Sequence, residues 1–210
     1  MTEGAFGSNS GKEDRYCNSR VAIDPFNPDV LYVATRTSGL YRSANATDAQ
    51  PSFERIESMP IGLQDSYHNG LPSGVGLVQT DPHRGTIGEG SNRRAKVVYA
   101  MARGNHPHQK KEQPQQGDVY RSIDGGETFA LIDGPNAPYI VYSIRFGGEG
   151  AVYMAGNNGI LKLDNNGTWH VLTGPGQPHV IGMDVLPGRP DRIVGLGRKQ
   201  LFRSTDGGAN

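Results

Sequence analysis

Two stretches of the chain combine a serine, an aspartate and two adjacent glycines, which are residue types that could perform nucleophilic or acid–base chemistry. Residues 121–129 read RSIDGGETF, and residues 203–208 repeat the start of this pattern as RSTDGG. A serine near a carboxylate is a possible nucleophile and base. The same residue types also build tight turns, because an aspartate accepts hydrogen bonds from nearby N–H groups and glycine adopts backbone angles that other residues resist.

A repeat along the chain favours the turn over the active site. Four segments share one plan of strand, turn, strand, loop and strand, and three of them end in the similar strands GLYRS, DVYRS and QLFRS. Tyr120 to Leu161 and Leu161 to Phe202 are both intervals of 41 positions. Four antiparallel strands that recur about every 40 residues are typical of a β-propeller blade. The 30 glycines and 14 prolines agree with many short strands and turns.

The sequence therefore predicts an all-β fold, a β-propeller with Asp-box (BNR-like) repeats and about four four-stranded blades. One propeller segment covers residues 1–210, with approximate blades at 20–60, 75–133, 139–173 and 179–210. Two polar insertions are expected around 60–74 and 103–117. The fourth repeat lacks an outer strand, so we expect open edges that pair with another propeller domain or chain. Residues near Phe6 are an alternative source of that strand.

Both glycine-rich stretches fall between the third and fourth strands of their repeats, where a hairpin turn is expected. The first matches the Asp-box pattern completely and the second as far as its last glycine, whereas residues 44–48 and 164–169 are degenerate copies. A motif that recurs at one turn per blade serves the fold, so no catalytic role is predicted. The structural Asp-box residues are Ser122, Asp124, Gly126, Thr128, Phe129, Ser204, Asp206 and Gly208.

Substrate-binding residues are expected at the opposite end of the blades, on the loops between second and third strands and on the links between blades. Arg36, Arg103 and Arg198 occupy the same place in three repeats, which also suits a shared contact at the blade edge. Tyr67 and His68 combine a stacking ring with hydrogen-bonding groups, as a sugar site needs. A polar link between blades is the alternative for this pair.

Composition excludes several classes of protein. Lys and Arg total 21, as do Asp and Glu, so no positive surface for nucleic acid is expected. No apolar run approaches the roughly 20 residues that span a membrane. Cys17 is the only cysteine, and the histidines at 106 and 108 stand in a polar loop, so neither a metal site nor a cofactor is predicted. The first residues lack a secretory signal pattern, which indicates a cytoplasmic protein or a start that lies further upstream.

The run NSRVAIDPFNPDVLYVATRTSGLYRS resembles the second blade of family 74 glycoside hydrolases, the xyloglucanases. The segments GLVQTDP, VYRSIDGGETF, GTWHVL and LFRSTDGG follow in the order that this family shows. The resemblance extends from about Gly7 to the end of the chain. It implies a secreted, inverting endo-glucanase with two seven-bladed propellers and the polysaccharide, a β-glucan of the xyloglucan type, in the cleft between them.

An inverting glycosidase needs two carboxyl groups about 6.5–9.5 Å apart. In the family that this chain resembles, one aspartate lies in the first blade and the other in the second propeller. The corresponding loop here, residues 36–39, reads RTSG and has no carboxylate. The resemblance thus implies a fragment that contributes part of the polysaccharide-binding face and is inactive alone. A non-enzymatic Asp-box propeller that binds protein or glycan, like sortilin-type receptors or assembly factors, is the alternative. A sialidase is disfavoured because no Phe-Arg-Ile-Pro motif precedes the first box.

Overall fold

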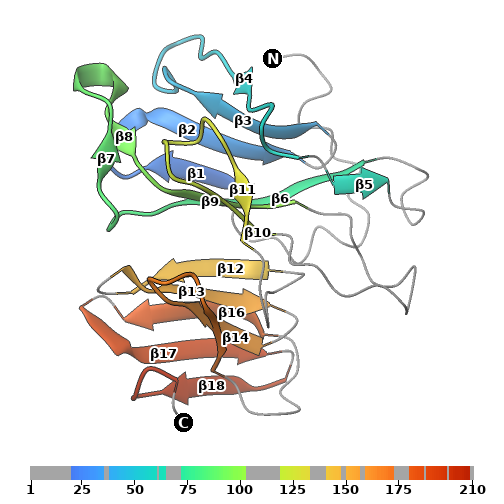
Figure 1. The fold of residues 1–210 in the computed structure, drawn as a ribbon, viewed down its shortest axis with the longest axis vertical. Coiled ribbons are helices and arrows are strands. Elements are labelled where there is room, and N and C mark those ends of the chain that lie inside the picture. Colours follow the sequence, from blue (N-terminus) through green and yellow to red (C-terminus); the bar gives the residue numbers. More distant parts are fainter. Residues whose placement is uncertain are drawn as a thin grey trace.

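Antiparallel β-strands make up nearly all of the regular structure in the computed structural model (Figure 1). The structure describes residues 20–35, 38–60, 62–64, 72–102, 119–132, 141–147, 150–156, 159–172, 180–186, 188–197 and 199–208. Within these ranges the one complete helical element is a single turn of 3-10 helix, η3 (Gly90–Asn92), and no helix is long and apolar enough to cross a membrane. The all-β prediction is confirmed.

The first sheet has the order β1–β2–β3–β4, with β1 (Val21–Asp24), β2 (Asn27–Thr35), β3 (Gly39–Ser43) and β4 (Glu54–Arg55). Side chains of β1 alternate between exposed and buried, because successive residues of a strand point to opposite faces. The buried Asp24 accepts the N–H of Phe26 at 2.9 Å and closes the turn into β2.

The second sheet has five strands in the order β11–β10–β9–β6–β5. Its strands are β5 (Gly62–Gln64), β6 (Pro72–Thr80), β9 (Val98–Ala102), β10 (Val119–Ser122) and β11 (Ala130–Leu131). The connection between β6 and β9 carries a small hairpin of β7 (Thr86–Ile87) and β8 (Arg94–Ala95). Sequence analysis expected neither β5 nor this hairpin. Strands of two or three residues are too short to show a period of two.

The third and fourth sheets continue the repeat. The third has the order β12–β13–β14–β15, with β12 (Val141–Phe146), β13 (Val152–Gly156), β14 (Gly159–Leu163) and β15 (Trp169–Val171). The fourth consists of β16 (Val180–Leu186), β17 (Arg189–Gly197) and β18 (Leu201–Ser204). Within the described residues this sheet has three strands, in the order β16–β17–β18. The expected contribution of residues near Phe6 lies outside the described residues.

The core consists of three apolar layers, each between one sheet and the next along the chain. Tyr32, Tyr99 and Tyr153 are buried at equivalent places on the second strands of their repeats, and each belongs to the layer that leads to the following sheet. The sheets thus pack face to face in chain order, as the blades of a propeller do. No sheet closes on itself within the part of the chain that the structure describes.

Candidate functional site

The turn of residues 122–129 is organised around two short polar side chains. Ser122 ends β10, and its hydroxyl donates to Asp124 Oδ1 at 2.7 Å and accepts the N–H of Gly126 at 2.8 Å. Asp124 Oδ1 also accepts the N–H groups of Glu127 and Thr128 at 3.0 and 2.9 Å. Asp124 Oδ2 accepts the hydroxyl of Thr128 at 2.5 Å. Both residues of the apparent catalytic pair are therefore engaged within the turn.

These bonds determine the protonation state of Asp124. Partial burial by itself raises the pKa of the carboxyl group, but the hydrogen bonds from Ser122, Thr128 and the N–H of Glu127 favour the charged form and outweigh it. The resulting pKa is about 2. A group with this pKa is a poor general acid or base near neutral pH.

The back of the same turn is covered by the first sheet and by the β7–β8 hairpin. The carbonyl oxygen of Gly125 accepts hydrogen bonds from Tyr32 Oη at 2.9 Å, Arg94 Nε at 2.8 Å and Arg42 Nη1 at 3.2 Å. Glu127 Oε1 lies 2.7 Å from both Arg42 Nη1 and Arg94 Nη2. The yellow β10–β11 hairpin can be followed beside the first sheet in Figure 1. This turn joins two sheets, and the buried Ser122 hydroxyl offers no open side to a substrate.

Two other turns reproduce parts of this arrangement. Ser204 Oγ donates to Asp206 Oδ1 at 2.7 Å and accepts the N–H of Gly208 at 2.8 Å. In the degenerate third repeat, Asp164 Oδ1 accepts the N–H groups of Asn166 and Thr168, both at 2.9 Å. Asp164 Oδ2 is 2.9 Å from His170 Nε2. This contact, together with the hydrogen bonds from the two N–H groups, lowers the pKa of Asp164. An aspartate four residues before a threonine is the signal that identifies this third turn.

A fully buried carboxyl group, Asp81, closes the turn after β6. It accepts the N–H of His83 at 2.8 Å and lies 3.3 Å from Arg84 Nε, while burial raises its pKa. Asp24 closes the equivalent turn of the first sheet and also accepts the N–H of Ala95 at 2.7 Å. Both carboxyl groups are enclosed at turns between strands, and neither is accessible to a ligand.

The predicted substrate-binding residues Arg36, Tyr67, His68, Arg103 and Arg198 lie outside the described residues, as do His106 and His108. Their positions follow β2, β5, β9 and β17. In an antiparallel sheet these strand ends lie at the opposite end from the Asp turns, which follow β3, β10, β14 and β18. Among the described residues, no group of three His, Cys, Asp or Glu side chains is placed to hold a metal ion.

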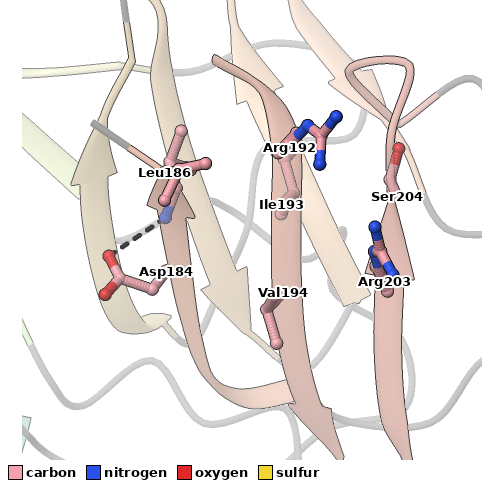
Figure 2. Close-up of a pocket in the computed structure, with 8 residues that line it drawn as sticks. Asp184, Leu186, Arg192, Ile193, Val194, Arg203 and Ser204 are labelled. Carbon is pink, nitrogen blue, oxygen red and sulfur yellow. Dashed lines mark hydrogen bonds between the residues drawn. The ribbon is translucent and has the colours of Figure 1, made fainter. Parts of the chain in front are cut away.

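An open depression of about 350 Å³ lies on the fourth sheet, over β16, β17 and β18. Figure 2 shows Asp184 and Leu186 on β16, Val194 on β17 and Arg203 on β18 around it. Asp184 Oδ1 accepts the N–H of Val185 at 3.0 Å. One carboxylate, arginine side chains and apolar side chains on a flat sheet face suit contact with another surface more than they suit catalysis.

The geometry of the described residues does not by itself indicate a family. Comparison with known proteins does, because it finds similar xyloglucanases. No family model matches the chain. A probable oligoxyloglucan-reducing end-specific xyloglucanase of Neosartorya fischeri is 26% identical over 219 residues, which cover 90% of this chain and 26% of that protein. Xyloglucanase Xgh74A of Acetivibrio thermocellus is 25% identical over 225 residues, which cover 93% of this chain and 25% of that protein.

Solved structures of GH74 enzymes are similar to this chain in fold. The GH74 xyloglucanase of Xanthomonas campestris superposes with a TM-score of 0.70 at 22% identity, over 97% of this chain and 30% of that one. The chain is a GH74-like β-propeller. The GH74 enzyme of Niastella koreensis has a TM-score of 0.67 at 23% identity, over 90% of this chain and 28% of that one. The predicted resemblance and propeller class are confirmed, and this GH74-like chain spans about a quarter of the length of the curated relatives cited here.

Proposed function

We propose that the chain is part of a xyloglucanase-like glycoside hydrolase and contributes part of its polysaccharide-binding face. The observation that carries this proposal is similarity to xyloglucanases over about nine tenths of the chain. The propeller fold, which the chain has in common with two GH74 enzymes, supports it.

The binding face proposed here lies at the end of the sheets opposite the Asp turns. At the Asp-turn end, Asp124 and the Gly125 carbonyl are already hydrogen-bonded within the chain, and Asp81 is enclosed. The opposite end carries Arg36, Tyr67, His68, Arg103 and Arg198 in the sequence. Tyrosine and histidine rings stack on sugar rings while their polar atoms hydrogen-bond hydroxyl groups, and these residue types are the basis for assigning glycan binding to this end.

The chain by itself is proposed to lack hydrolytic activity. Inversion requires a carboxylic acid and a carboxylate that face each other across a water molecule. Residues 36–39, at the loop where the related family carries one aspartate, contain no acid. Asp124 and Asp164 accept hydrogen bonds inside their own turns. The activity of any larger enzyme would therefore depend on carboxylates supplied from elsewhere.

Affinity electrophoresis in gels that contain xyloglucan tests the binding proposal. We expect xyloglucan to retard the chain, and Tyr67→Ala to weaken binding about tenfold, which equals about 1.4 kcal/mol. Arg36→Ala should also weaken it. Arg55→Ala is the matched control, because Arg55 is an exposed arginine on β4 that pairs only with the neighbouring Glu57 among the described residues. Unretarded migration of the unmodified chain would refute glycan binding.

A reducing-end assay on xyloglucan tests the proposal that the chain alone lacks hydrolytic activity. No release of reducing ends is expected from the chain alone at any pH between 4 and 8. Turnover above a heat-denatured control would mean that this chain contains a catalytic pair of carboxyl groups and would refute this part of the proposal. Binding of a protein in place of xyloglucan would instead favour the non-enzymatic propeller.

A further inference from the structure

An exposed Asn–Gly pair lies in the turn between β14 and β15. Asn166 is exposed, and Gly167 after it has φ of +84° and no atom within 4 Å of the place that a Cβ would take. In the complete Asp turn the position of Asn166 is occupied by Gly126, since each lies two residues after the aspartate. Two other Asn–Gly pairs of the sequence, 69–70 and 158–159, have their asparagines outside the described residues.

The side chain of Asn166 differs from that of its neighbour. Within the described part of the chain, no hydrogen bond holds the amide group of Asn166, whose backbone N–H donates to Asp164 Oδ1 at 2.9 Å. Asn165 is also exposed, but its Oδ1 accepts Arg84 Nη2 of the second sheet at 3.1 Å. Of these two adjacent asparagines, Asn166 is thus the one whose amide can turn towards the next peptide nitrogen.

An asparagine followed by glycine undergoes a defined reaction in water. The backbone nitrogen of the glycine loses its proton and attacks the side-chain carbonyl carbon, the bond from that carbon to the amide nitrogen breaks, and ammonia leaves a cyclic succinimide. Water then opens the ring at either carbonyl carbon and gives aspartate or isoaspartate. The reaction consumes water, releases ammonia and needs no oxidant. Glycine favours the attack because it has no Cβ to crowd the nitrogen and its backbone is permissive.

The complete Asp turn contains an Asp–Gly pair that is protected from the equivalent reaction. The carboxylate of Asp124 accepts hydrogen bonds from the hydroxyl of Ser122 and from both the N–H and the hydroxyl of Thr128. The N–H of Gly125 donates to the carbonyl oxygen of Lys96 at 2.9 Å. A carboxylate held in this way cannot reach the next nitrogen, and it is a poorer electrophile than an amide.

The Gly167 nitrogen is held only within its own turn. Its N–H donates to the carbonyl oxygen of Asp164 at 3.1 Å, in a turn whose residues 165, 166 and 168 are exposed. Hydrogen bonds on an exposed turn open at low cost in free energy, because water replaces them. The attacking nitrogen and the amide carbon of Asn166 are therefore both available in the folded chain.

We propose that Asn166 deamidates spontaneously in the folded chain, so that the turn between β14 and β15 is a site of chemical ageing. Asparagine is among the residues that limit the chemical durability of proteins. An isoaspartate at residue 166 carries the backbone through the side-chain carbon and adds a methylene group before Gly167. The bonds from the N–H groups of Gly167 and Thr168 to Asp164 then lose their geometry. This inference does not depend on xyloglucan binding.

Incubation of the folded full chain at about pH 8.5 and 37 °C, followed by peptide mapping, tests the proposal. Trypsin places each Asn–Gly pair in a different peptide, and peptide 163–192 contains Asn165 and Asn166 as its only asparagines. We expect Asn166 to gain the mass of an exchange of amide for acid, while Asn165 stays intact as the internal control. An isoaspartate-specific carboxyl methyltransferase should methylate the converted peptide, because isoaspartate has a free backbone carboxyl group.

Two variants separate the reaction from the stability of the turn. Gly167→Ala should slow conversion about tenfold, because a Cβ crowds the attacking nitrogen. Asn166→Gln keeps an exposed amide and leaves Gly167 in place, and conversion at residue 166 should fall to background because the longer side chain closes a ring less readily. In the unmodified sequence, amide hydrogen exchange at Thr168 should be faster after conversion than before it.

Several outcomes would overturn this proposal. An intact Asn166 in the folded chain would do so, as would equal conversion of Asn165 and Asn166. Conversion that occurs only in urea would also overturn it, because the folded turn would then protect the amide. Unchanged hydrogen exchange at Thr168 after conversion would refute the effect on the turn.

Discussion

The turns at Asp124 and Asp164 share one internal hydrogen bond but differ in their surroundings. In each, the aspartate Oδ1 accepts the N–H of the threonine four residues later at 2.9 Å. The first turn is covered by Tyr32, Arg42 and Arg94, whereas Gly167 in the second has no atom near its Cβ position. Local sequence thus forms the turn, and the neighbouring sheet decides how much stability depends on it.

Replacing one glycine of each turn by alanine should give the largest difference in stability between the two turns. Gly126 and Gly167 both have φ of +84°, which costs an alanine about 1–2 kcal/mol. A Cβ on Gly126 would also lie 2.7 Å from the ring of the buried Tyr32, and such overpacking adds about 1–3 kcal/mol. We expect Gly126→Ala to cost about 3 kcal/mol in urea unfolding and Gly167→Ala about 1 kcal/mol. Equal losses would contradict the contrast between the turns.

Removal of the carboxylate should have the next largest effect. Asp124→Ala leaves two N–H groups and two hydroxyl groups of the turn without their acceptor, and hydrogen bonds to charged groups contribute about 1.5–3 kcal/mol. Because the carboxylate is partly exposed and water can replace it, we expect a loss of about 2 kcal/mol in the free energy of unfolding. Asp164→Ala should cost less, since solvent reaches its turn more freely. A larger loss at Asp164 would reverse the comparison.

Acid should weaken the Asp124 turn over a defined range of pH. The folded pKa is about 2, below the unfolded value near 3.9, so the stabilisation is complete above about pH 4 and is lost as the pH falls towards 2. After discounting for solvent screening, this amounts to about 1 kcal/mol. Unfolding of Asp124→Asn, which does not titrate, should therefore depend less on pH between 4 and 2 than that of the unmodified chain. Parallel curves would show that Asp124 is not the group responsible.

The smallest effect is expected from the ion pairs. Glu127→Gln removes the negative charge that pairs with Arg42 and Arg94, whose side chains are mostly buried, and should cost about 0.5–1 kcal/mol at low salt. The effect should shrink in 1 M NaCl as screening increases. Asp184→Asn breaks a more exposed pair with Arg145 and should be close to neutral. If the loss of stability caused by Glu127→Gln did not depend on salt, packing and not charge would account for it.

Sequence analysis predicted the repeat, the four groups of strands and the positions of the Asp turns, because each depends on patterns within a few residues. It missed β5 and the β7–β8 hairpin, which are too short to show a period. For the candidate site, Arg36, Tyr67, His68, Arg103 and Arg198 remain predictions, since they lie outside the described residues.

The sequence alone determined that residues 122–129 form a turn, since the bonds of Ser122 and Asp124 reach no further than four positions along the chain. Only the tertiary structure decided that this turn joins two sheets. Tyr32 and Arg42 lie 93 and 83 positions from Gly125, and no local pattern encodes a partner at that separation. Sheet packing brings them together, because burying apolar faces fixes the orientation of each blade and carries the polar side chains with it.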